Sequence, residues 1–338
     1  MFSRSKPKLP EAITRCYQLK VIHNALGKRI RIPSSELAGL DIRREVMDLK
    51  DNGPHFFAPY RDVILKPRYD DSDDEIDDES DDKSDNKGDD KSDDQSNDKS
   101  DDQSNDKSDD KSDDKSDDKS NDKSNDESND RSDDKSNDES DYYFNWDEII
   151  GEKPFWNAHA LAGYLSGYAG NCELPNEDVS PEGICYADWG DYGFGDLVDL
   201  TDGSQWQLKT AWYMLDETAP HIVAILISEM ALTAEDGTPL FADPDDVPLF
   251  HGEIKTAICI TRARLCTTSL HMNVNAPVLI FSSIGEHHVR VIEAYHDGHG
   301  LVMRVTRPFD MEKRNDALLL LLLRWMLGGA SDKSTKLC

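Results

Sequence analysis

Residues 80–139 consist of four-residue units that nearly all read Ser-(Asp/Asn)-Asp-(Lys/Gln/Glu/Arg), and they carry no apolar side chain. In a helix this period would place Asp next to Asp at i,i+4, where like charges repel. Ser, Asp and Asn also favour hydrogen bonds to their own backbone outside helices. A solenoid is excluded, because its repeat unit needs an apolar face and about 20 residues. With nothing to offset an ordering entropy of about 1–2 kcal/mol per residue, this stretch is expected to stay disordered.

The charge divides the chain into parts of different character. The net charge of −31 over 338 residues is spread as +7 over residues 1–69, −23 over 70–141 and −15 over the rest. We therefore expect a basic α/β segment (1–69), a disordered acidic repeat (70–141), an α+β globular body (142–330) and a disordered tail (331–338). Residues 1–69 hold too little apolar material for an independent domain, so we expect them to pack with the body.

Apolar periodicity predicts which segments form helices and strands. Helices are expected over residues 11–26, 33–49, 157–170, 221–232, 251–270 and 315–327. Strands are expected over residues 28–32, 61–67, 205–215, 277–283, 287–298 and 300–309. Asp297-Gly298 joins the last two strands as a hairpin, because glycine accepts a positive φ. The predicted fold class is α+β, with helices packed on a small, mainly antiparallel sheet that the long acidic repeat interrupts.

The same periodicity predicts buried positions in two of the helices. In the first helix one stripe holds Ile13, Tyr17, Val21 and Leu26. In the helix over 251–270 the expected core positions are Ile254, Ile258, Ile260 and Leu265. The aromatic residues in and near the strand over 205–215 either line a pocket or belong to the core; they are Trp189, Trp206, Trp212 and Tyr213.

Composition restricts the class and the compartment. An acidic total argues against nucleic-acid binding, since phosphates attract Lys and Arg. The six cysteines form no CxxC pair, which favours free thiols in a reducing compartment over a zinc ribbon or a disulfide scaffold. No secretory signal opens the sequence, and the apolar run over 318–323 is far shorter than the roughly 20 residues that a bilayer requires. We expect a protein of the cytoplasm or nucleus, neither secreted nor membrane-spanning.

The segment that begins "PVLIFSSIGEHHVRVIEAYHDG" resembles the C-terminal segment of a group of uncharacterised fungal proteins. The residues that carry the resemblance are Pro277, Val278, Leu279, Ser282, Gly285, Arg290, Ala294, Asp297, Gly298 and Arg304. Where that pattern has Ser after the last Arg, this chain has Val305-Thr306. The likeness covers about 75 residues and implies a fungal source and a shared module. It implies no reaction, because the group has no assigned activity.

The string Glu253-Ile254-Lys255 matches the E-x-K element of the PD-(D/E)xK nucleases. In those enzymes two carboxylates hold Mg²⁺ and the Lys steadies the attacking water. The second carboxylate would come from Asp199, Asp243, Asp245 or Asp246. The motif requires a strand, however, whereas Glu253 and Lys255 fall in a predicted helix. The alternative interpretation is an exposed pair of charges on that helix.

Histidines gather between positions 287 and 299, with carboxylates nearby, which is a composition that suits Zn²⁺ or another divalent ion. His288 and His296 share one face of the predicted strand, and His299 follows the turn. These three are the candidate metal ligands. Histidine at strand ends and turns is also ordinary, so the pattern by itself predicts no cofactor.

These observations favour a soluble intracellular interaction or accessory protein with an acidic disordered insertion. One alternative is a divergent metal-dependent nuclease or hydrolase that uses Glu253 and Lys255 with an Asp. A second is a binder of basic, histone-like proteins through the acidic tract. Acid-directed kinases prefer Ser followed by acids, which fits Ser72, Ser124 and Ser136. A neutral expansion of a surface loop explains the repeat equally well, because loop-closure entropy grows slowly with length.

Overall fold

The computed structural model describes residues 11–65, 154–172, 184–186, 197, 205–214, 219–232, 234, 238, 240–241, 243 and 246–336. All of them belong to one compact unit, to which residues on both sides of the repeat contribute. The predicted disorder of the repeat and the three candidate phosphorylation sites, Ser72, Ser124 and Ser136, lie outside the described residues. None of the described helices combines the length and apolarity needed to cross a bilayer.

The described unit has an α+β fold, as the sequence predicts. Its α-helices are α1 (Glu11–Leu26), α2 (Ser34–Leu37), α3 (Pro154–Asn171), α5 (His251–Leu265) and α6 (Asp316–Met326), with 3-10 turns η1 (Ala38–Leu40) and η6 (Thr268–Leu270). The main sheet contains β2 (Ile42–Val46), β4 (Ile184–Tyr186), β5 (Trp206–Met214), β6 (Ile222–Ser228), β8 (Val278–Ile284), β9 (His288–His296), β10 (Leu301–Val305) and β11 (Phe309–Asp310). Two short pairs join β1 (Arg31–Ile32) to β7 (Leu249–Phe250) and β12 (Gly329–Ala330) to β3 (Phe57–Ala58).

The main sheet is mixed but mostly antiparallel, in the order β2-β10-β9-β8-β6-β5-β4, with β11 on β9. Only β2 with β10 and β6 with β8 run parallel among the described pairs. The predicted hairpin at Asp297-Gly298 is confirmed: Gly298 has φ +100°, and β9 and β10 pair from His296 opposite Leu301 onward. Because β2 lies before the repeat and β10 after it, the sheet is built from both flanks of the repeat.

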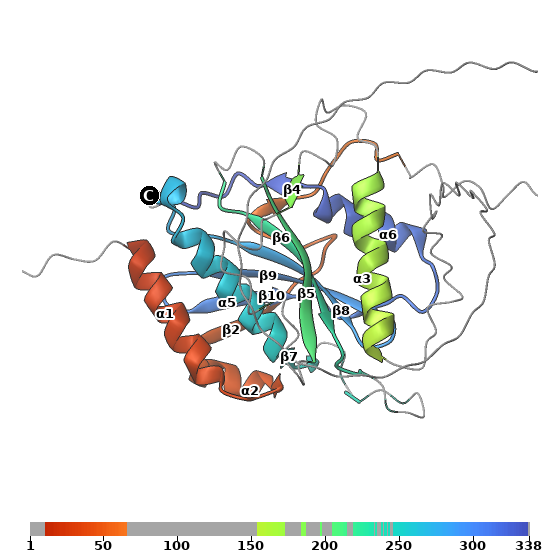
Figure 1. Ribbon diagram of the computed structural model, residues 1–338, viewed down its shortest axis with the longest axis horizontal. Helices are drawn as coiled ribbons and strands as arrows, with labels where there is room; N and C mark the ends of the chain where they lie inside the picture. The colour runs from red at the N-terminus through yellow and green to blue at the C-terminus, as the bar shows by residue number, and fades with distance from the viewer. Residues whose placement is uncertain are drawn as a thin grey trace, which may run out of the picture. The chain divides into compact units, whose positions relative to one another are not determined.

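Helices cover both faces of this sheet. Figure 1 shows α1 and α5 on one side and α3 and α6 on the other. Alternation along β8 fits this arrangement: Val278 and Ile280 pack in the α1/α5 core, and Leu279 and Phe281 in the α3/α6 core. Strands that are buried on both faces read as continuous apolar runs instead of alternating ones.

That property explains one wrong prediction. The segment 221–232, which we expected to be helical, contains β6, and all seven residues of that strand are buried. An apolar run of this kind carries no periodicity that separates a two-sided strand from a buried helix. The predicted helix over 33–49 is also wrong beyond Leu37. Asp41 takes a left-handed conformation (φ 55°), and the chain then enters β2.

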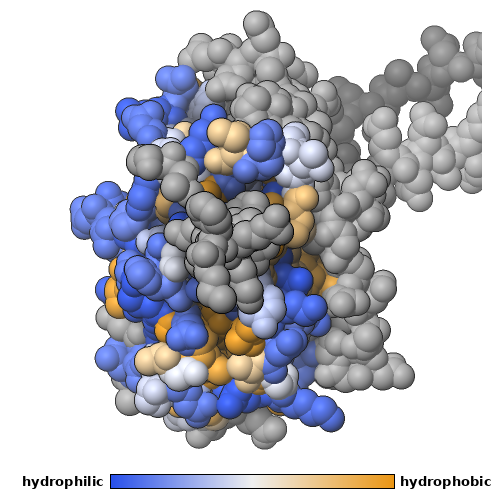
Figure 2. Space-filling model, turned by 90° about the vertical axis from the view of Figure 1, so that its left-hand side faces the viewer, coloured by the Kyte–Doolittle hydropathy of each residue, from blue (hydrophilic) through white to orange (hydrophobic). Residues whose placement is uncertain are grey.

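The buried face of α1 differs from the predicted stripe. Ile13, Tyr17 and Val21 are 52%, 69% and 48% exposed. The helix instead packs through its other side, and its buried residues are Ala12, Leu19, Ile22 and Leu26. Figure 2 shows the side of the unit on which α1 lies, where apolar residues appear among hydrophilic ones. The predicted core of α5 is confirmed, since Ile254, Ile258, Ile260 and Leu265 are all buried.

Two further predictions, the strand over 61–67 and the disordered tail from 331, need correction. The described part of 61–67 forms no strand. Residues 331–336, which we expected in a disordered tail, return along the body. The buried Thr335 hydroxyl donates to Asn273 Oδ1 at 2.6 Å, and its carbonyl accepts from Val274 N at 2.9 Å. These hydrogen bonds offset the lack of apolar residues in that segment.

Each face of the sheet buries one arginine–glutamate pair that fixes a segment outside the sheet. On the α3/α6 face, Arg304 Nη1 lies 3.0 Å from Glu293 Oε2. Glu293 also accepts from the backbone N–H groups of His55 and Phe56 at 2.8 and 2.7 Å. The pair therefore ties the loop at residues 52–56 to the middle of the sheet, and the second pair, on the α1/α5 face, involves Glu253.

Candidate functional site

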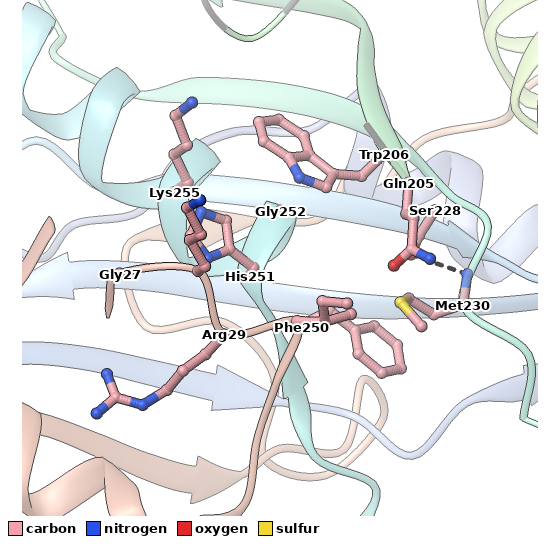
Figure 3. Close-up of a pocket in the computed structure, with 12 residues that line it drawn as sticks. Gly27, Arg29, Gln205, Trp206, Ser228, Met230, Phe250, His251, Gly252 and Lys255 are labelled. Atoms are coloured by element: carbon pink, nitrogen blue, oxygen red, sulfur yellow. Dashed lines mark hydrogen bonds between the residues drawn. The ribbon is translucent and has the colours of Figure 1, made fainter. Parts of the chain in front are cut away.

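A pocket of about 320 Å³ lies where the chain leaves α1 and enters α5. Four separate segments line it, at residues 27–30, 205–206, 228–230 and 250–255. One side of the pocket is formed by Gln205, directly before β5, by Ser228 at the end of β6 and by Met230 two residues further on (Figure 3). This volume suits a small organic ligand, because pockets that bind such ligands typically measure about 300–1,000 Å³.

The local chain geometry explains why these segments meet. Gly27 ends α1 with φ +59°, a left-handed conformation that glycine adopts without strain. The chain then turns back, so that Ile32 pairs with Leu249 and the carbonyl of Ile30 accepts from His251 N at 2.9 Å. The end of α1 and the start of α5 are thereby held side by side.

Trp206 forms the apolar wall of the pocket and packs on the first turn of α5. A Cβ added at Gly252 would lie 2.4 Å from Trp206 Cγ, so this close approach depends on glycine. One turn further, Lys255 Nζ lies 5.2 Å from the centroid of the indole ring, a cation–π contact. Figure 3 shows Trp206, His251 and Lys255 at the same end of the pocket.

The charged groups that line the pocket are all basic. Lys28 is exposed and Lys255 half-buried, and the lining contains no carboxylate among the described residues. Arg29 is also part of the lining, but its guanidinium is committed to the end of α1, where Nη1 donates to the carbonyl of Ala25 at 2.6 Å. In Figure 3 its side chain extends away from Trp206. The two lysines thus supply the positive charge available to a ligand.

His251 adds a neutral polar group at ordinary pH. Burial is the main cause that lowers its pKa below the usual 6.5, and the charge of Lys255 lowers it further, against a hydrogen bond with the backbone of Arg29 that raises it. Its ring lies 6.4 Å from that of Trp206. The pocket therefore combines an aromatic wall, two ammonium groups and a neutral imidazole.

Glu253, the candidate catalytic carboxylate, is fully buried and has a structural role. Arg290 Nε donates to its Oε1 at 2.7 Å, and Arg290 Nη2 pairs with its Oε2. The same Oε2 accepts from Phe250 N at 2.8 Å, which caps α5. Both carboxylate oxygens are thus taken by donors within the protein, and Arg290 occupies the place that a metal ion would need.

The structure does not bring the E-x-K residues together at one centre. Glu253 points to the sheet, whereas Lys255 lies over Trp206. Among the candidate aspartates, Asp246 accepts from the Ser34 hydroxyl at 2.8 Å and lies near Arg44, and the carbonyl of Asp243 accepts from Asp246 N at 3.0 Å. Asp199 and Asp245 lie outside the described residues.

The structure separates His288 from the other two candidate metal histidines. His288 and His296 stand at opposite ends of β9, about 26 Å apart at the usual rise of a strand. His296 is buried, and its Nδ1 accepts from Gly298 N at 3.0 Å. His299 lies in the turn, where its N–H donates to Asp297.

A different group, His287, His288 and Asp310, places three potential ligand atoms within 4.8 Å of one another in the described part of the chain. The two imidazole rings are stacked at 4.4 Å with an interplanar angle of 29°. Lone pairs in nearly parallel planes do not converge on one ion, so these rings would have to turn before they could share a metal. Burial, with the charge of His287, lowers the pKa of His288 to about 4.

Sequence reasoning found part of the pocket and missed the rest. Trp206 was one of the aromatic residues that could line a pocket, and it does, whereas Trp212 is buried in the α3/α6 core. Lys28 and His251 carried no signal, because their role depends on β1 pairing with β7. Comparison with protein-family models, with curated proteins and with solved structures finds no match to this chain.

Proposed function

We propose that this chain is a binding protein whose folded unit holds a small organic anion in the pocket at Trp206. The observation that carries the proposal is the lining itself: Lys28, Lys255 and the half-buried indole of Trp206 line one pocket, with Lys255 over the indole and no carboxylate among the described lining residues. This lining is basic in a chain whose net charge is −31. A locally positive pocket on an acidic protein selects anions against cations.

The chemistry of the lining defines the ligand class. A carboxylate or phosphate would pair with the lysines, and a planar body would lie against Trp206. Because the pocket opens to solvent, each lysine should add only about 1 kcal/mol, or about fivefold in affinity. Contact with the indole adds burial of apolar surface at about 25 cal/mol per Å². Neither an isolated phosphate nor an uncharged aromatic would use both features.

The test uses three probes that differ in one property each: 1-naphthyl phosphate, 1-naphthol and inorganic phosphate. Isothermal titration on the full chain should show the tightest binding for 1-naphthyl phosphate, with an affinity that falls as salt is added. Lys255→Ala should weaken it about fivefold and Trp206→Leu by more, while Lys50→Ala, an exposed lysine outside the pocket, should leave it unchanged. Equal binding of 1-naphthol and insensitivity to Lys255→Ala would refute the proposal.

The proposed role is binding and not metal-dependent hydrolysis. Its support is the placement of Glu253, whose two oxygens are engaged by Arg290 and by Phe250 N. A nuclease of the type suggested by the sequence would need that carboxylate free for Mg²⁺. The proposal extends the prediction from the sequence of an interaction protein in the cytoplasm or nucleus. A fungal source is part of the same prediction.

The acidic tract supports a second, separate proposal: capture of basic proteins. The net charge of −23 over residues 70–141 favours it, since such a chain attracts Lys-rich and Arg-rich partners at low salt. Removal of residues 80–139 should then abolish the capture of a histone-like protein at low salt. Equal capture by the full and shortened chains would exclude this role without affecting the pocket.

A further inference from the structure

Two cysteines from distant parts of the chain meet between α1 and α5. Cys16 lies in the middle of α1, and Cys266 is the residue that follows the last turn of α5. Their Sγ atoms are 3.2 Å apart, although 250 positions separate them in the sequence. Cys16 and Cys266 are not joined by a disulfide in the structure.

The packing of the two helices fixes this approach. The end of α1 lies beside the start of α5, where Ile30 accepts from His251 N at 2.9 Å, so the helices run antiparallel. Near the other end of α5, the Cys16 thiol donates to the carbonyl of Arg262 at 3.5 Å. The packing of α1 on α5, with a hydrogen bond near each end of the helix pair, therefore holds the two sulfur atoms close together. Their proximity does not depend on a surface loop.

The pair is placed for bond formation. A disulfide requires an S–S distance of about 2.05 Å, so the sulfur atoms need to approach by about 1 Å, which side-chain rotation can supply. Cys266 is exposed and Cys16 is half-buried. A small reagent can thus reach Cys266 first, and Cys16 lies directly behind it.

We propose that Cys16 and Cys266 form a reversible intramolecular disulfide that clamps α1 to α5. The co-reactant is a low-molecular-weight disulfide. The Cys266 thiolate attacks one of its sulfur atoms, forms a mixed disulfide and releases one thiolate. Cys16 then loses its proton and attacks Cys266 Sγ, which releases the second thiol. Two protein thiols are oxidised by two electrons, and one external disulfide is reduced to two thiols.

The environment of Cys16 makes it the later of the two thiols to react. Burial is the main cause that raises its pKa to about 12, followed by its hydrogen bond and charge interaction with Cys266, while Arg262 acts in the opposite direction. Once Cys266 is in the mixed disulfide, it carries no charge, so its contribution disappears. The order of attack follows: Cys266 reacts first and Cys16 resolves the intermediate.

The bond would also stabilise the folded unit, because it closes a loop that spans the whole repeat. Long loops gain the most from closure in the chain-entropy description, and the increase in Tm should be about 5–10 °C. This inference does not rest on the proposed anion binding.

The experiment treats the full chain with glutathione disulfide and maps its cysteines by peptide mass spectrometry under alkylating, non-reducing conditions. A peptide pair linking Cys16 to Cys266 is expected, together with the rise in Tm, and both should be reversed by dithiothreitol. Cys266→Ser should abolish the rise in Tm, and Cys259→Ser, on the same helix, should retain it. Cys266 is exposed, so its substitution should not prevent folding.

Three results would overturn the inference. The first is absence of the linked peptide pair although Cys266 is fully glutathionylated, and the second is a linked pair that forms only after the protein is unfolded. The third is a rise in Tm on oxidation that is equal in wild type and in Cys266→Ser, which would assign the effect to another cysteine pair.

Discussion

Arg290 illustrates how a single buried charge fixes the pocket's position. Its guanidinium is fully buried, pairs with Glu253, donates to the carbonyl of Pro248 at 2.9 Å and lies 4.7 Å over the ring of Phe250. These contacts connect β9 to the start of α5. Arg290 and Arg304 are each the basic member of a buried ion pair.

Removing one partner of this pair should be costly. Arg290→Met leaves the Glu253 carboxylate buried without its counter-charge, and we expect a loss of about 3–5 kcal/mol in the free energy of unfolding. The double variant Glu253→Leu/Arg290→Met buries no charge and should recover most of the loss, except about 1 kcal/mol for the cap at Phe250 N. Urea denaturation of the three proteins measures these differences.

An exposed pair provides the matched control. Arg43 pairs with Asp297 at 2.9 Å, and its side chain is 56% exposed. Arg43→Ala should therefore cost less than about 1 kcal/mol. A double variant that is as unstable as Arg290→Met would contradict the view that the unpaired charge causes the loss.

At the scale of elements, replacement by alanine should have opposite effects on stability at two helical glycines, Gly252 and Gly163. Alanine at Gly252 would place its Cβ 2.4 Å from the indole of Trp206, so Gly252→Ala should destabilise the protein by about 1–3 kcal/mol. Gly163 lies inside α3 with no atom within 4 Å of an added Cβ. Gly163→Ala should stabilise by about 0.5–1 kcal/mol, because alanine loses less backbone entropy in a helix.

Thermal unfolding of both variants checks this pair of predictions. A stabilised Gly252→Ala protein would mean that Trp206 moves away freely from α5, and the pocket wall would then not be fixed. Increased stability in Gly163→Ala alone supports the packing of Trp206 on the first turn of α5.

The elements that the sequence predicted correctly are those with local signals. The strands β8, β9 and β10 follow from apolar runs and the Asp297-Gly298 turn, and α6 begins where the Asn315 side chain accepts from Leu318 N. β6 was missed because both of its faces are covered, by α3 on one side and α5 on the other. The face of α1 was misjudged because the small Ala12, and not the larger Tyr17, faces the body.

At the scale of the whole molecule, the pocket could not be predicted because no local pattern contains it. Lys28 and Lys255 are 227 positions apart and line the same pocket only because β1 pairs with β7. The E-x-K and histidine patterns were visible in the sequence. A short string of polar residues does not reveal, however, which side chains the fold will place beside it. Arg290 reached Glu253 from another strand, and β9 separated His288 from His296.

The arrangement of the sheet makes a prediction about the repeat. β2 lies before the repeat and pairs with β10, so the fold requires both flanks to be connected. The sequence gives residues 80–139 no apolar side chain, so they should contribute nothing to the core. Their removal shortens the connection between Leu65 and Pro154 to about a third of its length. Loop-closure entropy then predicts a gain of about 1 kcal/mol in the free energy of unfolding.

Urea denaturation of the shortened and full chains measures this gain, and the slope of the transition provides an internal control. That slope scales with the surface exposed on unfolding, so it should remain the same if the removed residues bury none. A loss of stability together with a smaller slope would show that the repeat forms part of the folded structure. A gain with an unchanged slope means that the two flanks fold as one unit around a connection whose length affects only its entropy.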